Sequence, residues 1–112
     1  DDIENIRIES IPDIIAMKLL SITDNGSRIK DFIDIAFLSS RYSLNDMLNF
    51  YLKKIPNSNA LMPLKALTYF EDIDFKESFV MLNHAFDWTE ISARLMDMAN
   101  SPNKIFPEPF ST

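Results

Sequence analysis

The sequence of 112 residues contains no cysteine and only one glycine, one histidine and one tryptophan. Without cysteine the chain can form no disulfide, no thiolate metal site and no cysteine nucleophile, a pattern that fits a reducing compartment. A single glycine excludes a glycine-rich phosphate-binding loop. No apolar run reaches the roughly 18 to 20 residues that a membrane-spanning helix needs. We therefore expect a cytoplasmic protein that does not enter the membrane.

The charge and composition of the chain limit the classes of function further. A formal net charge of -6 and a pI near 4.6 argue against nucleic-acid binding through the overall field, because such binding usually rests on a basic face. The 46% content of hydrophobic residues is enough for one core in a chain of this length. We expect one folded unit.

The first residues carry the only strand signal in the sequence. Residues 3–8 alternate weakly, with Ile6 and Ile8 on one side and Arg7 on the other. A lone strand leaves its backbone hydrogen-bonding groups unpaired, and no second strand is evident. Because the chain also begins at Asp1 rather than at methionine, we expect a fragment of a longer polypeptide, whose orphan strand pairs with missing sheet or with a second copy in a homodimer.

The next segments carry helix signals. A capping-box pattern at Ser10 and Asp13, with Pro12 in the first turn, predicts a helix that ends near Thr23. The turn residues 24–26 follow, and Ser27 is the expected N-cap of a second helix that reaches about Ser40. The two helices are expected to form a tight hairpin.

Three more helices are predicted further along the chain. Ser43 and Asp46 form a second capping-box pattern ahead of a clean apolar stripe over residues 44–55. A helix over residues 60–68 tolerates Pro63 in its first turn, and another over residues 88–99 is expected to begin at a cap on Asp87. Residues 71–86 are interpreted as a loop with at most one short helix. The acidic run 71–74 is expected to be a solvated surface turn, and the lone His84 a structural residue.

The predicted fold class is therefore mostly α: a bundle of about five helices preceded by one short strand. Residues 1–100 are assigned to the folded unit, with the orphan strand in residues 1–10 and the helices in residues 11–100. Residues 101–112 contain Pro102, Pro107 and Pro109 and are expected to form an extended tail. Three apolar residues of this tail are free to dock on a groove: Ile105, Phe106 and Phe110.

Ionisable residues interrupt the most apolar helix. Residues 27–40 are apolar on nearly every side, so Asp31 and Asp34 cannot easily reach water. At a spacing of three residues the two carboxylates share a face, and Lys30 lies one turn before Asp34, so an internal ion pair is available. Each buried charge lowers the stability of the fold by roughly several kcal/mol unless it is paired. The pair is either purely structural or part of a functional site.

Three basic residues gather near the start of the same helix: Lys18, Arg28 and Lys30. Cations beside a helix N-terminus, where free N–H groups also point outward, favour an anion such as phosphate. For Lys18 alone, the alternative is a stem that lies on apolar surface with its ammonium group in solvent.

At these positions the sequence resembles a known family. Residues 13–21 fit the pattern D-x-x-A-x-K-L-x-A, with Ser21 in place of the usual alanine, and residues 28–34 fit R-x-K-D-x-x-D completely. Residues 56–59, 64–72 and 88–90 also look like bacterial members. Together these segments resemble the C-terminal part of the nucleotidyltransferase AbiEii toxins of type IV toxin-antitoxin systems.

The resemblance implies a polymerase-beta-like enzyme that transfers a nucleotide from a nucleoside triphosphate (NTP) to an acceptor, with magnesium held by carboxylates on a sheet. Lys18 would contact the triphosphate and Asp31 would support catalysis. Arg28, Lys30 and Asp34 would position phosphate or hold the helix pair. Cations around the charged oxygens are what phosphoryl transfer chiefly needs. An antitoxin protein is a further partner that the resemblance implies.

The chain departs from the family in one respect. It has neither the G-S loop nor the D-x-D metal pair that members carry ahead of these segments, so residues 3–8 would be the last strand of a missing nucleotidyltransferase sheet. The chain alone is therefore expected to be inactive. The alternative from another class is a non-catalytic helical module that binds a protein partner, with Phe106 and Phe110 as anchors.

Overall fold

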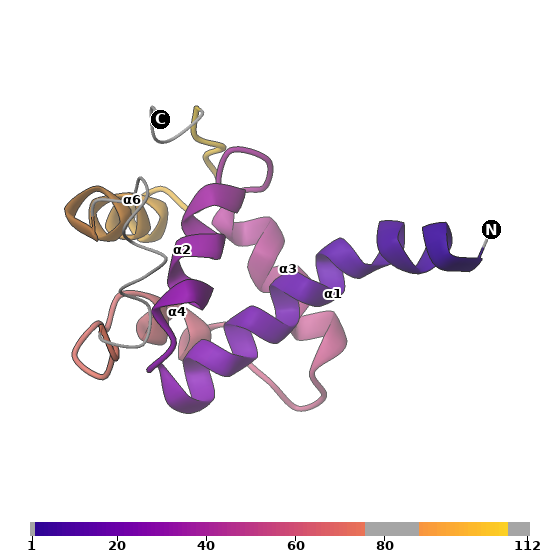
Figure 1. The fold of residues 1–112 in the computed structure, drawn as a ribbon, viewed down its shortest axis with the longest axis horizontal. Coiled ribbons are helices and arrows are strands. Elements are labelled where there is room, and N and C mark those ends of the chain that lie inside the picture. Colours follow the sequence, from indigo (N-terminus) through magenta and orange to yellow (C-terminus); the bar gives the residue numbers. More distant parts are fainter. Residues whose placement is uncertain (1, 76–87, 108–112) are drawn as a thin grey trace.

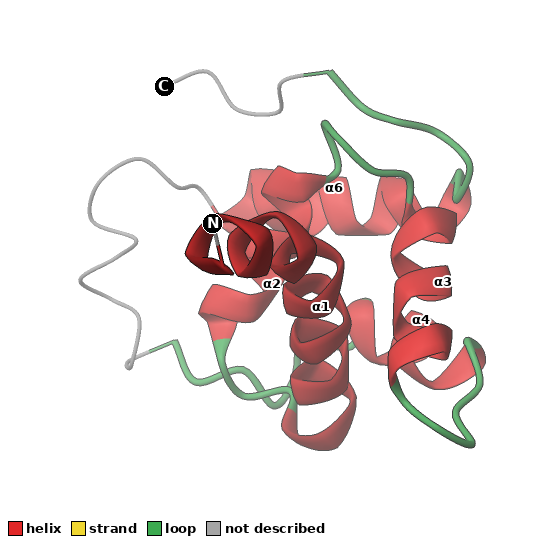
Figure 2. Cartoon of the chain, turned by 90° about the vertical axis from the view of Figure 1, so that its right-hand side faces the viewer, coloured by secondary structure: helices red, strands yellow, loops and turns green. Residues whose placement is uncertain are grey.

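The computed structural model describes the backbone of residues 2–75 and 88–107, and the side chains of these residues from residue 11 onward. The described part is helical and contains no strand (Figures 1 and 2). This confirms the mostly helical fold class. The described helices are α1 (Asp2–Asn25), α2 (Ile29–Leu38), α3 (Leu44–Lys54), α4 (Leu61–Leu67) and α6 (Trp88–Asn100).

The predicted orphan strand is wrong, because residues 3–8 form the first turns of α1. An alternation over six residues is too short to separate a strand from a helix, and isoleucines recur at a helical spacing of three residues from Ile8 through Ile11 to Ile14. The predicted helix start at Ser10 is also wrong, because α1 begins earlier and continues through Ser10 and Pro12. A homodimer paired through residues 3–8 as a strand loses its structural basis.

Helix α2 lies at the centre of the molecule, between α1 and α6, while α1 also packs against α3 and α4 (Figure 1). Nearly every apolar side chain in the first two turns of α2 is buried, which confirms the prediction of a central helix. The Phe32 ring packs edge-to-face against Phe70 and Trp88, with ring centroids 6.0 and 6.4 Å apart. Apolar contacts therefore surround α2 and fix its position.

The hairpin between α1 and α2 depends on the one glycine. Gly26 has a φ of +32°, a conformation that L side chains rarely adopt, and its N–H donates to the Ile22 carbonyl at 3.0 Å. Helix α2 then begins at Ile29 with Arg28 at the N-cap and no side-chain capping bond. The predicted cap at Ser27 is therefore wrong, although the hairpin itself is confirmed.

The helices α3 and α4 begin as their sequences predict. The Ser43 hydroxyl accepts a hydrogen bond from the Asp46 N–H at 3.1 Å, which confirms the cap. Pro63 is buried within the first turn of α4, and the Asn59 carboxamide oxygen accepts from the N–H groups of Leu61 and Met62. The Asn59 side chain, one residue before the N-cap Ala60, and a proline in the first turn thus mark the start of a seven-residue helix.

The tail docks on the body through one aromatic residue. Phe106 is buried and its backbone N–H donates to the Ser39 carbonyl at 2.9 Å, so the predicted docking is confirmed for this residue. It is wrong for Ile105, whose side chain is 53% exposed. Phe110, like His84 and the expected cap at Asp87, lies outside the described residues. The division between a folded unit and a tail at residue 100 stays a prediction.

Helix length and hydropathy also bear on membrane insertion. Within the described ranges, no helix combines the length and the apolar character that spanning a membrane requires.

Candidate functional site

The tight hairpin brings a lysine of α1 against two carboxylates of α2. Lys18 is followed by the buried Leu19, which anchors this turn of α1 in the core, and Asp31 lies between the buried Ile29 and Phe32 of α2. With the apolar faces of both helices packed together, the polar groups that share those faces meet at the seam. The packing of the core therefore places Lys18 beside the carboxylates.

The Lys18 ammonium group bridges the two carboxylates. Its Nζ lies 2.6 Å from Oδ2 of Asp34 and 3.6 Å from Oδ1 of Asp31. The Lys18 side chain is 20% exposed and that of Asp34 29% exposed, so the pair is only partly shielded from water. The interpretation of Lys18 as a lysine whose ammonium group is free in solvent is wrong, because that group contacts both carboxylates.

The Asp31 carboxylate is the most buried charged group of this cluster. Its side chain is 7% exposed, and its Oδ2 atom has no hydrogen-bond partner among the described residues. A buried carboxylate oxygen without a partner costs about 1 to 3 kcal/mol or more. Native proteins tolerate few such groups, and each calls for an explanation.

The other two basic residues lie on the outside of the cluster. Lys30 Nζ is 3.2 Å from the same Oδ2 atom of Asp34, so the ion pair predicted from the spacing of four residues is confirmed. Arg28 is exposed at the N-cap of α2, without a side-chain capping bond. Asp34 is thus shared by two lysines, and Lys30 and Arg28 face solvent at the edge of the cluster.

The acidic run at residues 71–74 lies on the surface, as predicted. The side chains of Asp72 and Asp74 are exposed and that of Ile73 is buried. The Asp74 N–H donates to the Ser27 carbonyl at 2.8 Å, which ties this loop to the residues just before α2. This run has the form D-x-D, but no group of three metal-ligating side chains occurs anywhere in the described ranges.

The Lys18 cluster does not fit a magnesium ion as it stands. Magnesium prefers oxygen ligands in a near-octahedral arrangement. Here the Lys18 ammonium group lies within 4 Å of both carboxylates, in the position that a cation bridging them would take. A metal ion would meet a like charge there.

The structure contains a second polar contact, at the other end of α2, that the sequence analysis did not predict. The Arg94 guanidinium of α6 donates through Nη1 to the buried Ser39 hydroxyl at 2.8 Å and lies 4.7 Å from the centre of the Phe106 ring. Burial lowers the pKa of Arg94 below its ordinary value, and the charge of Asp97 partly opposes this shift. Fifty-five residues separate Arg94 from Ser39, so no local pattern could predict the contact.

The comparison with known families settles where the chain belongs. The sequence model of the nucleotidyl transferase AbiEii toxin family, type IV toxin-antitoxin system, matches residues 2–108. The chain belongs to this family. A search of curated proteins and a search of solved structures returned no match.

Membership of the AbiEii toxin family agrees with the resemblance seen in the two motifs. The structure of this family member brings Lys18 of the first motif against Asp31 and Asp34 of the second. Lys30 joins them through Asp34, whereas Arg28 of the second motif makes no ion pair with a described residue. The roles of these five residues in a reaction stay predictions.

Proposed function

We propose that the Lys18 cluster is the triphosphate-binding side of a nucleotidyltransferase active site. In this proposal the substrate is an NTP and the product is a nucleotidylated acceptor. The observation that carries it is the Asp31 carboxylate, which is buried beside Lys18 with one oxygen unpartnered. A group that costs stability in the folded chain is well explained by a role in chemistry.

The cations of the cluster suit the charge of a triphosphate. Lys30 and Arg28 are exposed and lie within three residues of Asp31, on the open side of the cluster. Lys18 and Lys30 both contact Asp34. If the Lys18 ammonium group turns to a phosphate oxygen, Asp34 therefore keeps its contact with Lys30. Such fixed cations stabilise the charge that spreads over phosphate oxygens during transfer.

The proposal assigns magnesium to carboxylates outside the Lys18 cluster, because Lys18 occupies the place between Asp31 and Asp34. The family pattern puts these carboxylates in a D-x-D pair ahead of the first motif. We therefore expect the 112 residues alone to be inactive, and the reaction to need a longer source protein that contains this chain.

The experiment is a transfer assay on the full-length source protein with each of the four labelled NTPs. Asp31→Asn is expected to lower transfer by at least about 100-fold, the usual scale for losing a group that handles a proton or a charge in the reaction. Asp46→Asn makes the same change in charge at an exposed position of α3 and is expected to leave the rate unchanged. Equal rates for all three proteins would contradict the proposal.

A second candidate function is a helical interaction module, and one surface favours it. Ile11, Ile14 and Met17 recur every three residues on α1 and are all exposed. Exposed apolar stripes of this kind mark protein contacts. The anchor predicted at Phe106 is wrong, because this residue is buried in the chain itself. A protein partner, such as the antitoxin that the family description implies, would instead bind α1.

The two candidates differ in what a surface substitution should do. Met17→Lys adds a charge to the exposed stripe, one residue before Lys18. If the chain serves mainly as a binding module, this variant loses its partner in a pull-down from the source cell while NTP transfer stays absent throughout. If transfer is detected and Asp31→Asn lowers it while Asp46→Asn does not, the enzyme proposal stands whatever the partner does.

A further inference from the structure

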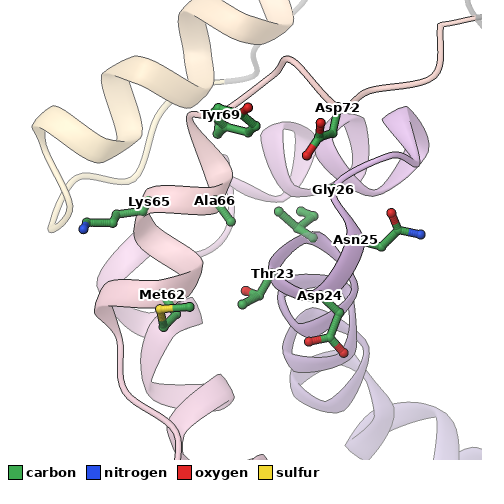
Figure 3. A pocket seen from close by; sticks show the side chains of 10 residues that line it. Thr23, Asp24, Asn25, Gly26, Met62, Lys65, Ala66, Tyr69 and Asp72 are labelled. Atoms are coloured by element: carbon green, nitrogen blue, oxygen red, sulfur yellow. The ribbon is translucent and has the colours of Figure 1, made fainter.

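A pocket separate from the Lys18 cluster lies where the end of α1 meets α4 (Figure 3). Its volume is about 310 Å³, at the lower end of the range for small-ligand sites. Six residues separate Lys18 from Asp24, which corresponds to about 9 Å along the helix. The lining comes from the last turn of α1, from Gly26, from α4 and from residues 69 and 72 just beyond α4.

The walls of the pocket are fixed by the backbone. The Gly26 N–H donates to the Ile22 carbonyl at 3.0 Å, and the Tyr69 N–H donates to the Ala66 carbonyl at 3.1 Å. The Asp74 N–H, two residues after the lining residue Asp72, donates to Ser27 at 2.8 Å. The first two bonds fix the chain at the ends of α1 and α4, and the third ties the loop after α4 to the residue that follows Gly26, so the backbone around the pocket is held without a ligand.

The charge of the pocket is negative. Asp24 and Asp72 both line it, and neither carboxylate forms an ion pair or hydrogen bond with a described residue. The last turn of α1 contains no basic residue, so the partial negative charge of this helix end is not compensated there. Lys65 contributes its stem, but Figure 3 shows its side chain directed away from the space into which Asp72 points.

The remaining lining suits the body of an organic cation. Tyr69 is 53% exposed and lies at one edge of the space, where a cation can approach its ring. Met62 and Ala66 of α4 and Ile22 of α1 add apolar surface to the lining. An aromatic ring, two carboxylates without an ion-pair partner in the described part of the chain and an apolar floor together form the kind of site that holds an alkylated cation.

We propose that this pocket binds an organic cation with an alkylguanidinium or alkylammonium head group. The head lies beside the Asp72 carboxylate near the Tyr69 ring, the alkyl chain lies on the apolar floor, and Asp24 adds negative charge elsewhere along the lining. This site is distinct from the Lys18 cluster and does not depend on the proposed transferase activity. A free small cation and the side chain of an arginine in a partner share this chemistry.

The test is an NMR titration of the full chain with n-butylguanidinium and with its neutral isostere n-butylurea. The cation is expected to shift the amide signals of Gly26, Tyr69 and Asp72 in a saturable way, with a dissociation constant on the order of 1 mM for so small a ligand. The urea is expected to shift them at least about fivefold more weakly. Equal binding of the two would overturn the proposal, as would the absence of saturable shifts.

Matched variants separate the pocket from the general acidity of the chain. Asp72→Asn is expected to weaken binding about three- to fivefold, the scale of one partly exposed ion pair. Glu71→Gln removes the neighbouring charge, which is exposed and outside the pocket lining, and is expected to leave the affinity within about twofold. If Glu71→Gln weakens binding as much as Asp72→Asn, a diffuse field attracts the cation and the site is refuted.

Two further ligands identify the source of the head group. Agmatine represents a free cation, and N-acetyl-arginine amide represents an arginine side chain of a partner. Tyr69→Leu is expected to weaken the tighter of the two about two- to fivefold, while Tyr69→Phe keeps its affinity because the ring face remains. Loss of affinity in Tyr69→Phe equal to that in Tyr69→Leu would contradict the placement of the head near the ring.

Discussion

The two polar contacts of α2 differ in how completely they are satisfied. At one end of the helix, the Ser39 hydroxyl donates to the Ala36 carbonyl at 2.6 Å and accepts from Arg94 at 2.8 Å. Toward the other end, Asp31 contacts Lys18 at 3.6 Å and leaves an oxygen without a partner among the described residues. Asp31 of α2 and Ser39, which caps the C-terminus of α2, are both buried, yet only Ser39 both donates and accepts a hydrogen bond.

This difference separates a contact that stabilises the fold from one that leaves a carboxylate oxygen available for a ligand. A buried polar group that is fully bonded holds the surrounding elements in one arrangement. A buried oxygen that is left unbonded costs free energy and contributes nothing to the fold. We therefore expect the Arg94 contact to dominate measurements of stability and the Asp31 contact to dominate measurements of function.

The largest expected effect removes the apolar part of the Arg94 contact. Phe106→Ala is expected to lower the free energy of unfolding by about 3 kcal/mol, the lower end of the usual cost of truncating a buried phenylalanine. Urea unfolding followed by circular dichroism measures this loss. Ile105→Ala changes the exposed neighbour and should stay within about 0.5 kcal/mol of the parent. Similar losses in both variants would show that the tail does not depend on Phe106.

The next effect removes the polar part of the same contact. Arg94→Met keeps an unbranched apolar stem but removes the guanidinium, which leaves the Ser39 hydroxyl with one bond fewer, so we expect a loss of about 1 to 3 kcal/mol in the free energy of unfolding. Arg41→Met is the control, because Arg41 is exposed. A loss in Arg94→Met no greater than in the control would contradict a structural role for this contact.

The Asp31 contact is expected to matter less for stability. Asp31→Asn keeps the shape of the side chain and leaves the 2.6 Å pair between Lys18 and Asp34 intact, so the free energy of unfolding should change by less than about 1 kcal/mol. Thermal unfolding of the variant beside the parent tests this. A loss above about 2 kcal/mol would show that the Asp31 carboxylate is a structural group, as the alternative interpretation of the sequence holds.

The smallest effect is expected at an exposed ion pair between α1 and α3. Lys54 Nζ lies 3.5 Å from Oδ2 of Asp13, and both side chains are largely exposed. Lys54→Met should change the free energy of unfolding by less than about 0.5 kcal/mol, because water and salt screen such pairs. A double-mutant cycle with Asp13→Asn measures the coupling directly. A coupling above about 1 kcal/mol would place this surface pair in the same class as the Arg94 contact.

The sequence predicted those parts of the fold that local patterns determine. The turn at Gly26, the Ser43 cap and the apolar character of α2 all rest on residues within a few positions of one another. The first turns of α1 were misinterpreted because the isoleucines of residues 3–8 fit both periods over so short a span. The sequence indicated that Ile105, Phe106 or Phe110 could dock, but it did not show that Phe106 is the one that is buried.

The candidate site was predicted in part for a similar reason. The pair between Lys30 and Asp34 follows from helical spacing, and the meeting of Lys18 with α2 follows from the hairpin. The unpartnered oxygen of Asp31 could not be foreseen, because it depends on how every neighbouring side chain packs. The pocket beside Tyr69 joins residues 22–26 to residues 62–72, which are far apart along the chain, and left no local signal.

The most direct test of the central claim is an NMR titration of the 112-residue chain with each NTP. We predict saturable shifts at the amide groups of Lys18, Arg28 and Lys30. Lys30→Met should weaken binding about tenfold, the value of one charge-assisted hydrogen bond, and the exposed Lys53→Met of α3 should not. Shifts confined to other regions, or equal weakening by both variants, would contradict a triphosphate site at the Lys18 cluster.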